Sequence, residues 1–307
     1  MTPPPRLTPQ AGPAIWTGAA LTPSDWMLPV GAEIAADLAA ALAEDGAGLL
    51  RLTPLLHQVA ERLEHGRGFV LLRGLNLDRL PDAGAALLLL CQQLGTALPQ
   101  DATGSLIGRL AGPGAAAEAP TRFHADPADA VALLCLQQPR EGGMVTLVSA
   151  PALHNALMKL DRAALATLHQ PLPHLGAEEP LSLPVFSTAS GAFVGRYDRD
   201  AMLEPALDAA QQAALAALDA TAAAPGQALS IPLHAGDLLF YNPHLVWKQV
   251  SAGEAATSDA AERQLLRLWL AMPGSRALPE SFRPVFGETA AGAPRGGMPV
   301  ATGMVGG

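Results

Sequence analysis

Cysteine and lysine are scarce in this chain of 307 residues, each of them occurring only twice. The cysteines, Cys91 and Cys135, lie inside apolar runs and form no Cys-x-x-Cys pair. Neither a zinc finger nor a disulfide framework is therefore expected, and we interpret both residues as reduced thiols of the core. The two lysines are Lys159 and Lys248, and their rarity makes each position informative.

Clusters of basic residues and long apolar runs are absent as well. The net charge is −9, which argues against broad binding to the phosphate backbone of nucleic acids. A membrane span takes about 20 apolar residues, more than runs such as 84–91 provide. Residues 1–13 are rich in proline and lack the basic start and apolar stretch of a signal peptide. The sequence therefore predicts a cytoplasmic protein without nucleic-acid or membrane partners.

Half of the residues are hydrophobic, so the chain can bury a large core. Apolar residues at helical spacing predict helices over 32–43, 55–64, 81–94, 152–168 and 204–222. Short apolar runs predict strands over 69–74, 130–137, 144–148, 230–233, 238–241, 245–250 and 265–271, and a hairpin over 183–194. With no repeat and no clear linker, we expect one α+β domain over 1–307, a barrel-like sheet sandwich with flanking helices. Residues 1–13 and 289–307 are expected to pack loosely.

His124 and Asp126 form a His-x-Asp motif between a loop and a predicted strand. Alternate residues of an extended segment point to the same face, so the imidazole and the carboxylate can reach one metal ion. Ferrous oxygenases hold iron with two histidines and one carboxylate on one face of the metal. The motif alone is weak, because a surface histidine beside a capping aspartate gives the same pattern.

Further blocks, in order along nearly the whole chain, resemble the taurine dioxygenase-like (TauD/TfdA) family of iron(II)/2-oxoglutarate oxygenases. They are residues 16–26, 68–74, 94–96, 122–136, 142–143, 236–242 and 263–270. The resemblance implies a double-stranded β-helix, a jelly-roll barrel, with the metal at its mouth. It also implies His124 and Asp126 as iron(II) ligands, and Arg267, with Arg263 nearby, as the residues that bind 2-oxoglutarate.

The position of the family's second histidine, counted from Gly236, is occupied by Lys248. A protonated amine has no lone pair to offer a metal. We therefore expect the Lys248 ammonium to take the metal's place and to pair with Asp126, offsetting the cost of burying either charge. The alternative is a lysine that points to solvent. His244 and His234 are alternative ligands, but His244 is displaced by roughly 13 Å along a regular strand and His234 needs a change of register.

A second departure follows the glycines at 142–143. The family usually has a Thr or Ser there that helps to bind 2-oxoglutarate, and this chain has Val145, while Thr146 faces the other way. Nearby aromatic residues, Tyr241 and Trp247, are assigned to the core or the outer face of the barrel, with a place lining the barrel as the alternative. Residues 195–197 are interpreted as a plain strand, with a basic side chain over the pocket as the alternative.

Three functions are compatible with these residues. The first is an atypical iron(II)/2-oxoglutarate oxidoreductase acting on a small molecule, with iron held by His124, Asp126 and water. The second is a metal-free descendant in which Lys248, the expected catalytic residue, and Arg267 bind or transform a carboxylate or oxo-acid, Lys248 by forming a Schiff base. The third is an inactive scaffold. A small molecule, carboxylate-bearing in the second case, is the expected partner, and a homo-oligomer is left open.

Overall fold

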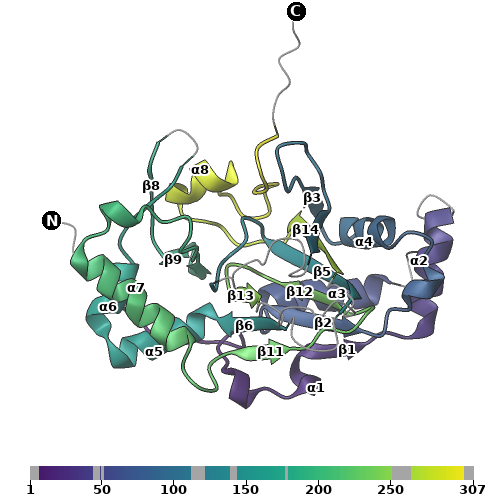
Figure 1. Cartoon of the computed structure of the whole chain (residues 1–307), viewed down its shortest axis with the longest axis horizontal. Coiled ribbons are helices and arrows are strands. Elements are labelled where there is room, and N and C mark those ends of the chain that lie inside the picture. Colours follow the sequence, from purple (N-terminus) through teal and green to yellow (C-terminus); the bar gives the residue numbers. More distant parts are fainter. Residues whose placement is uncertain are drawn as a thin grey trace, which may run out of the picture.

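A mixed sheet forms the centre of the molecule, with strand order β1-β2-β12-β5-β14-β3 and β4 also paired to β14 (Figure 1). The computed structural model describes residues 7–43, 49, 52–111, 122–138, 144–176, 179–250 and 264–300. Only β1 and β2 pair in parallel within this sheet. Its strands are β1 (Met27–Pro29), β2 (Phe69–Arg73), β3 (Thr96–Leu98), β4 (Gly108–Ala111), β5 (Ala130–Gln137), β12 (Leu238–Tyr241) and β14 (Gln264–Ala271).

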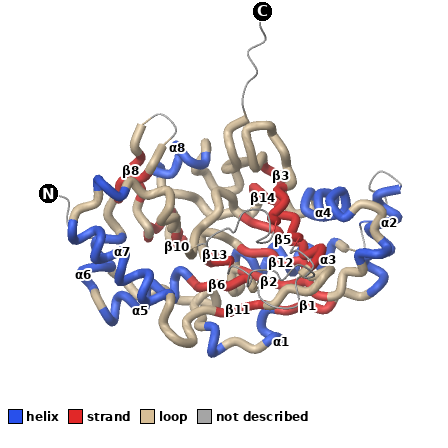
Figure 2. Tube along the Cα trace, in the orientation of Figure 1, coloured by secondary structure: helices blue, strands red, loops and turns tan. Residues whose placement is uncertain are grey.

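A second, antiparallel sheet has the order β11-β6-β13 and shares a core with the inner face of the first. Its strands are β6 (Val145–Ser149), β11 (Leu229–Ile231) and β13 (Val246–Val250). Two further antiparallel pairs are β7 (Leu172–His174) with β8 (Leu181–Leu183), and β9 (Phe186–Ala189) with β10 (Ala192–Gly195). The strands gather in the middle of the molecule, with helices to either side (Figure 2).

The alternation of side chains along the central strands separates two cores. In β5, Val131 and Leu133 belong to the core between the sheets, whereas Ala132 and Leu134 belong to the core beneath the helices. Both faces of the strand are therefore buried, which explains why its sequence is continuously apolar rather than alternating. The same parity fixes which residues of β12 and β14 face the barrel interior.

Three helices, α2 (Ala32–Ala43), α3 (Thr53–Glu64) and α4 (Ala83–Gln92), supply the outer core. Three others, α5 (Ala150–Leu160), α6 (Arg162–Leu168) and α7 (Ala209–Ala222), pack against one another on the opposite side (Figure 1). The single helix expected over 152–168 is divided. Asp161 leaves the helical conformation, and its carboxylate accepts the backbone N–H of Ala164 as the cap of α6.

Short helical segments complete the chain. They are α1 (Pro23–Trp26), α8 (Arg283–Phe286) and the 3-10 turns at Gly18–Ala20, Leu77–Arg79, Glu204–Ala206 and Glu280–Phe282. Within the described ranges, no helix has the length and apolarity needed to cross a membrane.

The C-terminal segment is anchored as far as it is described, in contrast to the loosely packed tail expected over 289–307. Arg295 is buried, and its guanidinium donates to Asp129 from Nε and Nη2 at 2.9 and 2.7 Å. Thr289 is buried as well, and the N–H of Gly296 donates to Phe286. Residues 301–307, like the predicted loop over 111–120 beyond its first residue and the turn at 142–143, lie outside the described ranges.

Candidate active site

The central sheet directs three polar or aromatic side chains into the barrel. In β14, Arg267 and Trp269 alternate with Leu266 and Leu268, which belong to the outer core. In β12, Tyr241 has the same parity as Leu239, a residue of the inner core. Because side chains alternate across a strand, all three polar groups face inward, toward the segment that carries His124 and Asp126.

The His-x-Asp segment pairs directly with β13. The N–H of His124 donates to the carbonyl of Lys248 at 2.9 Å, and the N–H of Lys248 donates back to His124 at 3.1 Å. Residues that exchange both hydrogen bonds in an antiparallel pair stand opposite each other, and their side chains share a face. The backbone therefore places Lys248 on the face of His124 and Asp126.

The Lys248 side chain is buried beside Asp126. Its Nζ lies 3.5 Å from Asp126 Oδ2, and the two side chains are 2% and 3% exposed. The same amine lies 5.7 Å from the centre of the Tyr241 ring. A lysine pointing to solvent is thus not what the structure contains, and the amine occupies the corner opposite the imidazole and the carboxylate.

Both oxygens of the Asp126 carboxylate are engaged. The Tyr241 hydroxyl donates to Oδ2 at 2.6 Å, and the Trp269 indole N–H donates to Oδ1 at 3.1 Å. Arg267 Nη1 also donates to Oδ1, at 3.4 Å. With Lys248, two neutral donors and two cations therefore surround one buried carboxylate, which satisfies the requirement that a buried charge be paired.

These neighbours fix the charge state of the site. Burial alone would raise the pKa of Asp126, but the charges of Lys248 and Arg267 and the Tyr241 hydroxyl hold it well below its usual value. Burial and the charge of Lys248 lower the pKa of His124. Its Nδ1 donates to the carbonyl of Arg122 at 2.9 Å, so the neutral imidazole keeps the lone pair on Nε2.

Arg267, expected to bind 2-oxoglutarate, is held by its neighbours. Its Nε donates to Gln100 Oε1 at 2.7 Å, and Gln100 Nε2 donates to the Arg267 carbonyl at 2.6 Å. The guanidinium stacks on Trp269, with Cζ 4.3 Å from the ring centre. Arg263 lies outside the described residues.

The second departure from the family pattern also has a clear place. Val145 is fully buried in the inner core, where it offers no hydroxyl to a ligand. Thr146 faces the other way, and its hydroxyl lies 3.0 Å from that of Ser230 on β11. The alternation of the strand therefore keeps Thr146 from substituting for the missing hydroxyl.

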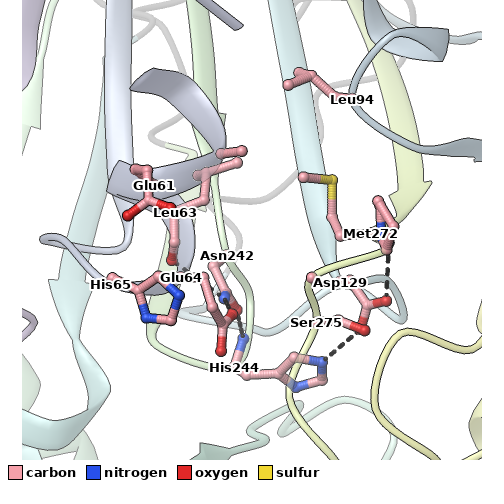
Figure 3. A pocket seen from close by; sticks show the side chains of 13 residues that line it. Glu61, Leu63, Glu64, His65, Leu94, Asp129, Asn242, His244, Met272 and Ser275 are labelled. Atoms are coloured by element: carbon pink, nitrogen blue, oxygen red, sulfur yellow. Dashed lines mark hydrogen bonds and ion pairs between the residues drawn. The ribbon is translucent and has the colours of Figure 1, made fainter. Parts of the chain in front are cut away.

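The alternative histidines lie elsewhere. His244 lines a separate cavity of about 110 Å³ beside the end of α3, where its Nε2 lies 3.5 Å from Asp129 (Figure 3). His234 is 65% exposed and lies 3.8 Å from Asp237. Among the described residues, no cluster of three or more His, Cys, Asp or Glu side chains could hold a metal. Neither histidine therefore completes a triad with His124 and Asp126.

Two aromatic residues contact Asp126 from inside the barrel. Tyr241 lies in the inner core, one of its expected places, and its hydroxyl also donates to Asp126. Trp269 was not singled out, although it stands two residues after Arg267 and so shares its face. Trp247 packs in the core as expected, stacked on Phe186 at 5.8 Å.

The sheets, the inward-facing residues and the His-x-Asp segment define an oxygenase-type double-stranded β-helix. The chain belongs to the taurine catabolism dioxygenase TauD, TfdA family, whose model matches residues 28–269. It is 27% identical over 263 residues to the FR-33289 synthase of Streptomyces rubellomurinus, covering 76% of this chain and 78% of that protein. Both the family resemblance and the expected fold class are confirmed.

Solved structures with the same fold include two iron oxygenases. One is asparagine oxygenase in complex with Fe(II), 2S,3S-3-hydroxyasparagine and succinate, with a TM-score of 0.65 and 18% identity. The other is the non-heme iron oxygenase OrfP with Fe, succinate and (3R,4R)-dihydroxy-L-Arg, with a TM-score of 0.61 and 16% identity. Each comparison covers 80% of this chain and 93% of the other. The expected cofactors, iron(II) and 2-oxoglutarate, agree with the iron and succinate in these structures and with the α-ketoglutaric acid in another structure of OrfP.

The side chains of this barrel do not fit a ferrous centre with three protein ligands. His124 and Asp126 supply an imidazole and a carboxylate, but the third corner holds an amine that, when protonated, has no lone pair. A dication beside the Lys248 ammonium would also be repelled. The carboxylate that would bind the metal is already surrounded by four donor groups.

Proposed function

We propose that this member of the oxygenase family binds a small anionic molecule at the barrel mouth, with the Lys248 ammonium in the position that its family gives to a metal ligand. The observation that carries the proposal is the contact of 3.5 Å between Lys248 Nζ and Asp126 Oδ2, both buried. The ammonium supplies positive charge next to the carboxylate, as a metal would, and needs no further ligand.

The balance of charge favours an anionic ligand. Lys248 and Arg267 contribute two positive charges, Asp126 contributes one negative charge, and His124 is neutral. Among these four side chains the positive charges exceed the negative by one, and the low dielectric of the barrel strengthens their action on a bound anion. A carboxylate or an oxo-acid meets this requirement, and a planar carboxylate suits the fork of the Arg267 guanidinium.

Binding is better supported than imine formation by Lys248. A Schiff base needs the neutral amine, whereas the ionised Asp126 at 3.5 Å stabilises the ammonium. Borohydride reduction in the presence of a 2-oxo-acid tests whether Lys248 forms an imine. We expect no added mass on Lys248, and a stable adduct there but not on Lys159 would make the amine a nucleophile.

Iron content is the decisive experiment. The wild type and a Lys248→His variant are titrated anaerobically with Fe(II) in the presence of 2-oxoglutarate, and bound iron is measured after desalting. We expect little iron in the wild type and about one iron per chain in Lys248→His, which restores the third ligand. Lys159→His is the matched control, because Lys159 is the only other lysine and is exposed.

A second candidate is an oxygenase whose iron rests on His124, Asp126 and water. The neutral imidazole, with its Nε2 lone pair free of the Arg122 contact, favours it. The same titration separates the two candidates. One iron per wild-type chain, with succinate released on exposure to oxygen, would establish the second candidate and overturn the first.

A further inference from the structure

Arg196 is a buried guanidinium without the partners that such a group ordinarily has. The residue is 8% exposed, and its Nε and Nη1 are enclosed without a hydrogen-bond partner in the described part of the chain. Its one ring contact is with Phe286, whose centre lies 5.8 Å from the guanidinium carbon. Because unmet donors on a buried charge are costly, an arrangement of this kind points to a ligand that accepts from them.

The other buried arginines show what a purely structural role looks like in this fold. Arg295 is 3% exposed and donates to Asp129 and to three backbone carbonyls. Arg276 donates to the carbonyl of Phe193 and forms an ion pair with Glu64 at 2.8 Å. Among the described residues, the Arg196 side chain forms neither kind of contact, so holding the fold together does not account for it.

The backbone places Arg196 next to the barrel mouth. It directly follows β10, and its N–H donates to the carbonyl of Val185 at 2.8 Å. The carbonyl of the next residue, Tyr197, accepts the N–H of Ala125 at 2.7 Å, within the His-x-Asp motif. The charges of Asp198 and Asp126 both act on the buried guanidinium, although neither carboxylate forms an ion pair with it in the described part of the chain.

A buried histidine beside Arg196 has an open position as well. His174 is 2% exposed, and its Nδ1 donates to the carbonyl of Leu172 at 2.9 Å. The lone pair on Nε2 is therefore available, and this atom is enclosed without a partner among the described residues. Burial lowers the pKa of this imidazole, and the charges of Arg196 and Asp198 act on it in opposite directions. The two side chains together offer donors for an anion and an acceptor for a hydroxyl.

We propose that Arg196 anchors an oxyanionic group of the substrate, a carboxylate or a phosphate-type group, and that His174 accepts a hydrogen bond from a hydroxyl of the same ligand. This site is distinct from Arg267 and lies on the β10 side of the barrel mouth. This proposal goes beyond the proposed function and does not depend on it, because Arg196 and His174 would bind the anion whether or not iron is held by His124 and Asp126.

Binding of two probe anions, succinate and inorganic phosphate, tests the site by isothermal titration calorimetry of the full chain. The variants are Arg196→Gln, Arg196→Lys and the control Arg162→Gln, which changes an exposed arginine at the start of α6. We expect the wild type to bind one of the probes, and the identity of that probe distinguishes a carboxylate from a phosphate group. Arg196→Gln should weaken its binding by about tenfold or more, because charge-assisted hydrogen bonds are lost.

The thermal midpoint without ligand separates binding from a structural role. We expect Arg196→Gln to melt at or above the wild-type temperature, because an unmet buried charge is removed, and Arg196→Lys to recover part of the affinity. Wild-type affinity in Arg196→Gln, or no binding of either anion to the wild type, would overturn the proposal. A lower midpoint with unchanged affinity would likewise make Arg196 a structural residue. The iron titration is a separate measurement, so failure here leaves its result intact.

Discussion

Replacing Lys248 by methionine should destabilise the protein, because it leaves a buried carboxylate with one cation fewer. Methionine is unbranched like lysine but one atom shorter, and it removes the charge. Two unit charges 3.5 Å apart attract by about 5 kcal/mol at an effective dielectric constant of about 20. Breaking a buried pair from one side costs about 3–5 kcal/mol. Since Arg267 and the Tyr241 and Trp269 donors remain on Asp126, we expect a loss of about 3 kcal/mol.

Equilibrium unfolding in urea, followed by tryptophan fluorescence, measures this loss. Lys159→Met, at an exposed position, should change the free energy of unfolding by no more than about 0.5 kcal/mol. Adding Asp126→Asn to Lys248→Met removes the orphaned charge, and we expect the double variant to recover at least about 1 kcal/mol. If Lys248→Met costs no more than Lys159→Met, the buried ion pair does not exist in solution and the reasoning fails.

Two further predictions concern the stability of the fold. Gly236→Ala should cost at least about 3 kcal/mol more than Gly191→Ala in the same urea assay. Both glycines have positive φ. An added Cβ at Gly236 would meet the Leu75 carbonyl oxygen at 2.0 Å, whereas one at Gly191 would meet open space. Equal losses of stability in the two variants would contradict this difference in packing. Burial lowers the pKa of His169 to about 4 from its usual 6.5. The unfolded chain therefore takes up the proton first, and stability should fall between pH 6.5 and pH 4 by up to about 3 kcal/mol. His169→Gln should remove this part of the acid sensitivity, whereas His57→Gln, at an exposed position, should retain it.

The strands that build the barrel could be predicted because their pattern follows from local physics. The predicted strand over 130–137 coincides with β5, and the run over 238–241 coincides with β12. Continuous apolar runs of this length indicate strands buried on both faces. The position of Lys248 could also be counted from Gly236, across β12 and the short connection to β13.

The partners around the site could not be predicted in the same way. Gln100 reaches Arg267 from a loop far away in the sequence, and no periodic pattern indicates that contact. Arg196 and His174 are brought near the barrel mouth by short strand pairs whose placement depends on tertiary packing. The division of the helix at Asp161 was missed because an aspartate can lie inside a helix or cap its start. Only the hydrogen bond from the Ala164 N–H to the Asp161 carboxylate shows that Asp161 is a cap.

A lysine can replace a metal-binding histidine in this fold because the strand and the ion pair depend on different atoms. The pairing of β13 with His124 uses backbone groups that any residue except proline provides, so the register survives the substitution. The carboxylate of Asp126 needs a cation, and the four-carbon side chain of Lys248 brings one to 3.5 Å without a metal. Arg267 also contacts this carboxylate, at 3.4 Å, so that Asp126 faces a second cation. With two cations on one carboxylate, these contacts carry an excess of positive charge, which is why we propose an anionic ligand.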